Sequence, residues 1–274
     1  MYPVASAISL RGFVAPWVFM WMIAVAIFAG FKWWTWHRAV TRGIETTWFR
    51  SVAFLFFWPG MDAEKFLAPD RTVPPPPARA WIFAAGKTLF GATLMWGLAR
   101  FAGQGLAAGW IGMVGFIFLL HFGLFHLLAL FWQRQGIDAV PIMRWPLLAR
   151  SAGDFWGRRW NAGFRDLAFG LLFTRLAGVL PPRAAMLAIF LVSGLLHELV
   201  ITLPAHGAYG LPTFYFALQG LGLLAERSLP SLRRGIMGRI FAIVLVAAPI
   251  TALFPAVFVL RVMVPFFQFI GALS

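Results

Sequence analysis

Long uncharged runs, separated by basic segments, dominate the pattern of hydrophobic and polar positions. The first run, residues 12–31, holds twenty residues without a charge, which is the length a helix needs to cross the hydrocarbon core of a bilayer. It has no basic stretch before it and no small-residue cleavage site, so we do not expect a removed signal peptide. The pattern predicts further spanning helices at residues 80–99, 106–132, 184–203, 209–225 and 240–260.

The segments between these runs have different characters. Residues 32–50 are basic and rich in tryptophan, as is typical of chain at the headgroup level. The apolar run 51–61 is too short to cross, and it is predicted to lie at the interface or to re-enter. Four prolines at 74–77 predict an extended connector. The tail 262–274 is expected to dip back into the bilayer.

Six crossings, within a range of six to eight, follow from this pattern, and they predict one all-α polytopic membrane domain over residues 1–274. Residues 133–183 carry eight arginines and three aspartates, an excess of five positive charges. If the basic segments 32–79, 133–183 and 226–239 share the cytoplasmic side, successive predicted helices cross the membrane in opposite directions, as they must. The sequence shows no internal repeat of the kind found in many transporters.

Composition excludes several classes of protein. Hydrophobic residues make up 61% of the 274 and charged residues 12%, which is far more apolar than a soluble domain. The 23 basic and 9 acidic residues give a net charge of +14, and this charge suits anionic headgroups better than nucleic acid, because no soluble basic domain is present. The absence of cysteine excludes disulfides and thiolate sites. Frequent Ala, Gly, Arg and Trp are typical of a GC-rich bacterial gene, so we expect the bacterial inner membrane.

Ionisable residues inside the apolar runs are candidates for chemistry, because a bilayer tolerates them only in a cavity or with a partner. His197 lies thirteen residues into its predicted helix and is followed at once by Glu198. A neutral imidazole beside a carboxylate is suited to act as a general base. A buried structural histidine is the simpler interpretation. Against it, His197 and Glu198 are adjacent, and each ionisable side chain is unfavourable inside a bilayer, so a purely structural role rarely needs both. Consecutive helical residues point about 100° apart, so we expect Glu198 to pair with another helix.

Three other polar residues lie within the runs. His121 and His126 are five positions apart, which places them on different faces of a helix, so they do not form a metal pair. We predict no metal site and no cofactor. Lys87 can extend its amine towards an interface, and we assign it no function.

A second candidate group is the run of residues 154–161, Asp-Phe-Trp-Gly-Arg-Arg-Trp-Asn. Read as one helix, it places Trp156, Trp160, Phe164 and Leu167 on one stripe, which is typical of an interfacial amphipathic helix. Asp154 and Arg158 have the spacing of a helical ion pair. A second reading gives the arginines to ligand phosphates and makes Asn161 a polar group of a site.

Together the run 154–161 and the segment 191–199, Leu-Val-Ser-Gly-Leu-Leu-His-Glu-Leu, resemble the wax synthase branch of the membrane-bound O-acyltransferase superfamily. The plant long-chain-alcohol acyltransferases carry a similar aromatic-Arg-Trp-Asn run, followed by a similar Ser-Gly-x-x-His-Glu segment. The close resemblance covers residues 150–205, and the chain is shorter than most members of the superfamily.

The resemblance implies helices around an intramembrane tunnel, with acyl-CoA entering from the cytoplasm and a lipophilic alcohol arriving from the bilayer. It makes His197 the catalytic histidine and Asn161 the polar residue that accompanies it. We assign substrate binding to residues beside these two: Trp156, Arg158, Arg159, Trp160, Ser193 and Glu198. Acyl-CoA is then a substrate, and the acceptor, the acyl chain length and the oligomeric state stay open.

Two other functions remain compatible with the residues. Ser193 and His197 have the i, i+4 spacing of an intramembrane serine hydrolase, although the flanking glycine of a nucleophile elbow is absent. A transporter or channel would instead use His197, Glu198 and Lys87 as a proton relay.

Overall fold

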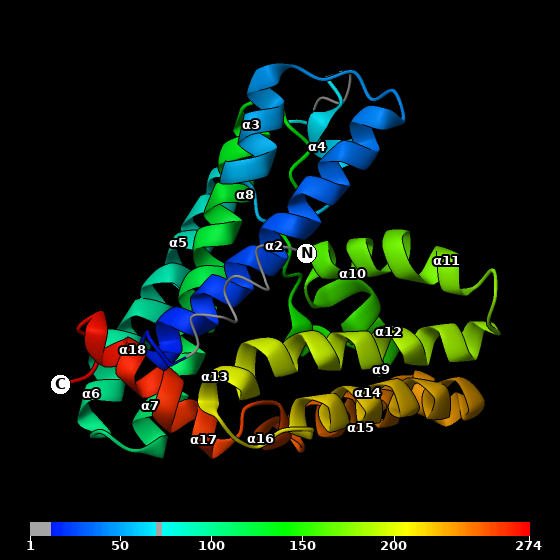
Figure 1. Cartoon of the computed structure of the whole chain (residues 1–274). Coiled ribbons are helices and arrows are strands. Elements are labelled where there is room, and N and C mark those ends of the chain that lie inside the picture. Colours follow the sequence, from blue (N-terminus) through cyan, green and yellow to red (C-terminus); the bar gives the residue numbers. More distant parts are fainter. Residues whose placement is uncertain (1–11, 70–72) are drawn as a thin grey trace. The chain divides into compact units, whose positions relative to one another are not determined.

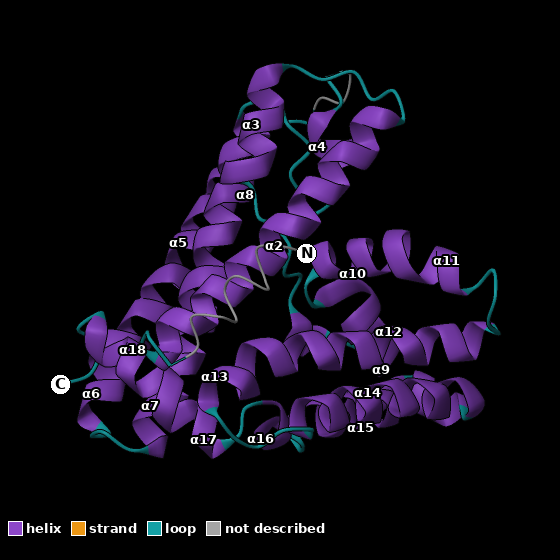
Figure 2. Ribbon diagram, viewed as in Figure 1, coloured by secondary structure: helices purple, strands orange, loops and turns teal. Residues whose placement is uncertain are grey.

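The computed structural model describes residues 12–69 and 73–274, and in this part of the chain helices and loops are the only elements (Figure 2). The protein is an all-α polytopic membrane protein. Residues 1–11, on which the signal-peptide expectation depends, lie outside the described residues. Many helices contain a π-helical segment, which continues the α-helix with a wider turn. The label η marks these segments and also the short 3₁₀ helices η3 and η7.

Five helices are long and apolar enough to cross a membrane: Pro16–Thr41, Ala78–Phe101, Leu106–Arg134, Pro182–Ala205 and Gly235–Leu253. The first is α2. The second combines α5 (Ala78–Ala92), η1 (Thr93–Leu98) and α6 (Ala99–Phe101), and the third combines α7 (Leu106–Phe116), η2 (Ile117–Leu124) and α8 (Phe125–Arg134). The fourth combines α12 (Pro182–His197), η6 (Glu198–Thr202) and α13 (Leu203–Ala205). These four correspond to the runs predicted at 12–31, 80–99, 106–132 and 184–203.

The last predicted crossing, residues 240–260, is wrong in its bounds. The helix α15 (Gly235–Ala247) starts earlier and stops before Pro249, and the short α16 (Ile250–Leu253) ends before Pro255. Proline has no N–H for the helix ladder, so each one interrupts the helix. The chain continues through α17 (Ala256–Phe258), η8 (Val259–Met263) and α18 (Val264–Phe269).

Two further apolar segments form shorter helices. α14 (Leu211–Ser228), predicted at 209–225, is a regular helix of 18 residues, but it contains Gln219, Glu226 and Arg227 and does not belong to the five most apolar ones. The short run at 51–61 forms α3 (Trp48–Phe57), which is ten residues long and too short to cross. Residues 73–77 form no regular element, as the prolines predict, and Pro77 is extended.

The described chain divides into two compact units (Figure 1). One unit comprises residues 27–143, 161–167 and 267–274, apart from the undescribed 70–72. In it, α3 and α4 (Ala63–Leu67) pack on part of α2 and on α8 through a buried cluster that includes Phe54, Phe66 and Trp132. The buried amine of Lys32 donates to the backbone oxygen of Gly60 and lies over the Phe54 ring.

The other unit comprises residues 12–26, 144–160 and 168–266, and it holds the histidine segment. Here α12 and α14 lie side by side (Figure 1). A Cβ atom at Gly194 would come within 2.7 Å of the Cα of Thr213, so only glycine permits this approach of α14. Both α14 and α15 contact α9 (Ala152–Asp154), and η5 (Ala168–Phe173) packs on α12. The remaining short elements of the chain are η3 (Pro146–Leu148), η4 (Phe155–Arg159), α10 (Ala162–Leu167), α11 (Thr174–Leu176) and η7 (Pro230–Arg233).

Candidate functional site

The run 154–161 is a short helical turn rather than one long helix. The hydroxyl of Ser151 accepts the N–H of Asp154 at 3.1 Å and caps α9. η4 follows directly, and Trp160 then turns to extended backbone. The predicted stripe through Trp156, Trp160, Phe164 and Leu167 is therefore wrong, because the helix ends at Arg159 and α10 begins only at Ala162.

The ion pair of Asp154 also differs from the prediction. Its carboxylate pairs with the Nε of Arg159 at 2.7 Å, and not with Arg158. η4 is a π-helix, whose hydrogen bonds join residues five apart, and its wider turn brings residue i+5 rather than i+4 alongside residue i. Arg159 also donates to the backbone oxygen of Trp145 at 3.2 Å. Arg159 thus holds the loop before α9 in place.

Trp156 and Trp160 have different surroundings. The indole of Trp160 stacks on Phe155, with ring centroids 5.5 Å apart. The Trp156 Nε1 donates to Oε1 of Gln219 at 3.2 Å, and its ring packs against Phe216 on α14. Trp156 is thereby part of the aromatic layer beside the histidine.

Asn161 adopts a left-handed backbone with φ of 41°, a conformation that asparagine tolerates better than most residues. Its Oδ1 accepts the N–H of Phe164 at 3.1 Å, so it caps the start of α10. Its own N–H points at the Sδ of Met143, 3.3 Å away. Asn161 belongs to the unit that contains residues 27–143.

His197 ends α12, and its imidazole is partly buried. Its Nδ1 lies 2.7 Å from the backbone oxygen of Ser193. A carbonyl oxygen only accepts, so the proton sits on Nδ1 and the lone pair of the neutral ring is on Nε2. No described residue hydrogen-bonds to Nε2. The ring packs on Phe216 at a centroid distance of 4.4 Å, and Phe216 also contacts Trp156.

Glu198 pairs with another helix, as its position predicts. Its Oε1 accepts both the N–H and the hydroxyl of Thr213 at 3.0 Å, and its Oε2 accepts the hydroxyl of Thr202. Thr213 lies in the first turn of α14, where backbone N–H groups have no partner within the helix and where negative charge is favoured. Glu198 therefore fixes α14 against α12.

Ser193 is buried, with 2% of its surface exposed. Its hydroxyl donates to the backbone oxygen of Ile189 at 2.9 Å. Ser193 orients His197 through its backbone oxygen instead of its hydroxyl. In this geometry the serine is not activated as a nucleophile.

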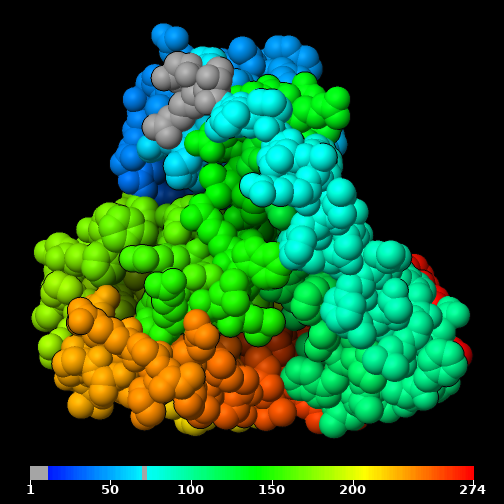
Figure 3. Space-filling view, turned by 180° about the vertical axis from the view of Figure 1, so that it is seen from behind, coloured from blue at the N-terminus to red at the C-terminus, as the bar shows by residue number. Residues whose placement is uncertain are grey.

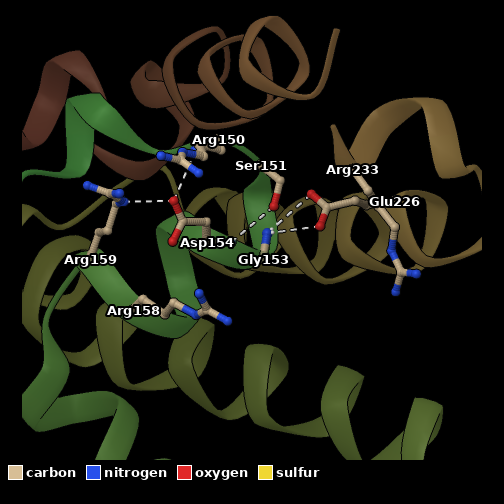
Figure 4. A pocket seen from close by; sticks show the side chains of 8 residues that line it. All are labelled: Arg150, Ser151, Gly153, Asp154, Arg158, Arg159, Glu226 and Arg233. Atoms are coloured by element: carbon tan, nitrogen blue, oxygen red, sulfur yellow. Dashed lines mark hydrogen bonds and ion pairs between the residues drawn. The ribbon is translucent and has the colours of Figure 1, made fainter. Parts of the chain in front are cut away.

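A cleft of about 350 Å³ opens beside α9 (Figure 4). Four arginines line it, namely Arg150, Arg158, Arg159 and Arg233, together with two carboxylates. Both carboxylates already have partners: Asp154 binds Arg159 and the N–H of Arg150, and Glu226 accepts the N–H of Gly153 at 3.2 Å. Among the described residues, the guanidinium groups of Arg150, Arg158 and Arg233 have no such partner. The cleft is therefore suited to an anion.

Electrostatics reinforce the ion pair in this cleft. Partial burial raises the pKa of Asp154. The opposing effects are larger and lower it: the hydrogen bond from Arg159, the hydrogen bond from the Arg150 N–H, and the positive charges of Arg159 and Arg158. The pKa of Asp154 therefore lies below its ordinary value, and its carboxylate is ionised at neutral pH.

The polar residues Lys87, His121 and His126 lie in the unit that contains residues 27–143. Lys87 on α5 and His126 on α8 approach to 2.7 Å between Nζ and Nδ1. Lys87 thus contacts a histidine rather than extending alone to an interface. The ring of His121 lies against Phe125 in an edge-on contact.

Two comparisons with known proteins bear on this site. Residues 139–217 match the Membrane bound O-acyl transferase family. A stretch of 71 residues is 39% identical to the long-chain-alcohol O-fatty-acyltransferase of Simmondsia chinensis. Over these residues the chain is similar to the membrane bound O-acyl transferase family. The matched stretch covers 23% of this chain and 20% of the plant protein, so the chain spans well under two thirds of that relative's length.

Within the matched stretch, three residues of the Ser-Gly-x-x-His-Glu segment have separate roles in the structure. Ser193 orients the imidazole, Gly194 admits α14, and Glu198 holds the start of α14. Sequence reasoning missed Thr213 and Gln219, which contact Glu198 and Trp156 from α14. A polar residue inside the apolar run 209–225 was the one signal that pointed to Gln219.

Proposed function

We propose that the protein is an O-acyltransferase that moves a fatty acyl group from acyl-CoA to the hydroxyl of a lipophilic alcohol, with His197 as the general base. The family match and the fatty-acyltransferase relative support the reaction class. The observation that carries the proposal is the bond from His197 Nδ1 to Ser193 O, because it leaves Nε2 as the proton acceptor.

The reaction needs one base and two bound substrates. Nε2 of His197 takes the proton of the alcohol while its oxygen attacks the thioester carbonyl carbon. The C–S bond then breaks, the ester is released, and the CoA thiolate takes the proton back from the imidazolium to leave as the thiol. Holding both substrates in one site lowers the barrier without a covalent enzyme intermediate.

Arg158 is the residue of the motif that we assign to the phosphates of the donor. It lines the cleft beside α9, and Arg159, its neighbour, is already engaged by Asp154. A guanidinium without a protein partner is free to bind phosphate oxygens in a bidentate manner. We keep Asn161 as the second predicted catalytic residue, with its side-chain NH₂ as the group that would donate to the oxyanion or the acceptor.

The basic segments 133–183 and 226–239 suit the cytoplasmic side of a bacterial inner membrane, where acyl-CoA is made. This topology agrees with an arginine cleft built from the same segments. The chain has no cysteine, so a single cysteine at Ser231 reports sidedness through a membrane-impermeant thiol reagent. Labelling only after the cytoplasmic face is exposed supports this orientation.

The experiment that tests the function incubates purified protein with labelled acyl-CoA, with and without a long-chain alcohol, and separates ester from free fatty acid. We expect ester that depends on the alcohol. Ser193→Ala keeps this activity, because the hydroxyl of Ser193 contacts only Ile189 O. Fatty acid as the main product, lost in Ser193→Ala, would show a hydrolase instead, and no turnover of the thioester would favour a transporter.

A further inference from the structure

The first turn of α15 forms one wall of a second cavity in the same unit. This cavity measures about 420 Å³ and is lined by Arg150, Gly235, Ile236 and Arg239. Gly235 begins the membrane-spanning segment Gly235–Leu253. The cavity therefore lies where a spanning helix leaves the bilayer, at the level of lipid headgroups.

The lining of this cavity carries positive charge without any carboxylate. Arg150 and Arg239 both expose their side chains, and neither guanidinium has an ion-pair or hydrogen-bond partner among the described residues. Asp154 and Glu226, the acids of the neighbouring cleft, are bound to Arg159 and to the N–H of Gly153. Two guanidinium groups around one hollow, without protein partners, are suited to bind a phosphate.

An apolar face continues from the cavity along the same helix. Ile236 is 67% exposed, and Ile240 and Ile243 follow at helical spacing with 48% and 53% exposed. Figure 3 shows α15, in orange, open at the surface. These side chains belong to a spanning helix, so we expect lipid acyl chains to pack against them.

We propose that this cavity binds the phosphate of an anionic phospholipid between Arg150 and Arg239, with the acyl chains lying along Ile236, Ile240 and Ile243. Charge complementarity selects an anionic headgroup, and the apolar face selects a molecule with chains attached to its phosphate. The lining offers no aromatic ring or side-chain amide to hold a nucleobase. A nucleotide phosphate therefore fits this cavity less well than a lipid phosphate does.

The bound lipid has a mechanical consequence. A Cβ atom at Gly238 would lie 2.8 Å from the backbone oxygen of Arg150, so the backbone of α15 already touches the loop that leads into α9. A phosphate held by both arginines links these two segments. The lipid then stabilises the position of α9 and of the residues that follow it. This inference does not depend on the proposed reaction.

The test measures lipid binding to the full chain in non-ionic detergent, by native mass spectrometry and by the shift in melting temperature. The probes are dioleoylphosphatidylglycerol and, as the zwitterionic control, dioleoylphosphatidylcholine. We expect tighter binding of phosphatidylglycerol, weakened about tenfold in Arg239→Gln, because one charge-assisted bidentate contact is lost. Arg239→Lys keeps the charge but not the bidentate geometry, so it should weaken binding less. Arg175→Gln, an exposed arginine on α11, is the matched control and should bind as the wild type does.

Coenzyme A and inorganic phosphate are added as competitors to separate the two sources of phosphate. Persistence of bound phosphatidylglycerol, together with unchanged coenzyme A affinity in Arg239→Gln, supports the lipid site. Displacement of the lipid by coenzyme A, with an equal loss of coenzyme A affinity in Arg239→Gln, would assign the cavity to the donor and overturn the proposal. Equal phosphatidylglycerol affinity in the wild type and in both Arg239 variants would also overturn it.

Discussion

Gln219 donates from its Nε2 to the backbone oxygen of Leu245 at 2.7 Å, and Pro249 is the reason that this oxygen needs a donor. Proline lacks the N–H that would bind the carbonyl four residues earlier in the helix. Tyr215, one turn before Gln219, donates to the next carbonyl, Val246 O, at 3.2 Å. The break in the last spanning helix is therefore satisfied by two side chains of α14.

The same amide reaches the candidate site, because the Oε1 of Gln219 accepts the indole N–H of Trp156. Gln219→Leu leaves the partly buried indole N–H of Trp156 and the buried oxygen of Leu245 unpaired, and a buried unpaired group costs about 1–3 kcal/mol. We expect a lower melting temperature and, through Trp156 and Phe216, slower acyl transfer. Gln135→Leu, at an exposed glutamine at the end of α8, is the control and should change neither. A variant at Gln219 with wild-type melting would contradict this role.

The contact between Glu198 and Thr213 makes a prediction about coupling. Thr213→Val removes the hydroxyl bond to Glu198 and keeps the backbone one, whereas Glu198→Gln removes the charge from both bonds, so each should lower stability by about 1–3 kcal/mol. The double variant should cost less than the sum of the two, because the interaction can be lost only once. Thermal melts of the four proteins measure this coupling, and simple additivity would show that the contact contributes nothing.

Gly194→Ala tests the close approach of α12 and α14. The added methyl group would meet the backbone of Thr213 at 2.7 Å, so α14 must move and carry Phe216 away from His197. We expect a loss of both stability and transfer activity. Gly86→Ala, in a helix where nothing lies within 4 Å of the added Cβ, should be neutral or stabilising by about 0.5–1 kcal/mol. Similar behaviour of the two variants would refute the packing argument.

Asp154 gives a prediction about pH. Its pKa is lowered in the folded protein, so its stabilising effect is present above its unfolded pKa of about 3.9 and is lost as the pH falls through the folded value. Asp154→Asn removes the ion pair with Arg159 at every pH. The melting temperatures of wild type and variant should differ at pH 7 and converge in acid. A difference that persists at the lowest pH would mean that charge is not the cause.

The sequence predicts the elements of this protein better than it predicts the contacts between them. Apolar runs locate four spanning helices to within a few residues, except that α2 continues to Thr41. They succeed because the length of an apolar run is a local property of the sequence. The bounds of the fifth fail at Pro249 and Pro255, since a hydropathy pattern does not register a missing N–H.

The candidate site shows the same division. His197 and the role of Glu198 follow from their positions in an apolar run, whereas the partner of Asp154 depends on a π-helical turn that no spacing rule reveals. Gln219 and Thr213 lie far along the chain from the residues they contact. Only the packing of α14 on α12 and α9 brings them there.

The central claim is that His197, held by Ser193 O, removes the proton of the acceptor alcohol. The most direct measurement is the rate of ester formation from labelled acyl-CoA and a long-chain alcohol by His197→Gln, with the melting temperature recorded alongside. Our account predicts a fall of at least about 100-fold, the usual contribution of a general base, while the protein stays folded. A folded His197→Gln variant that forms ester at the wild-type rate would contradict it.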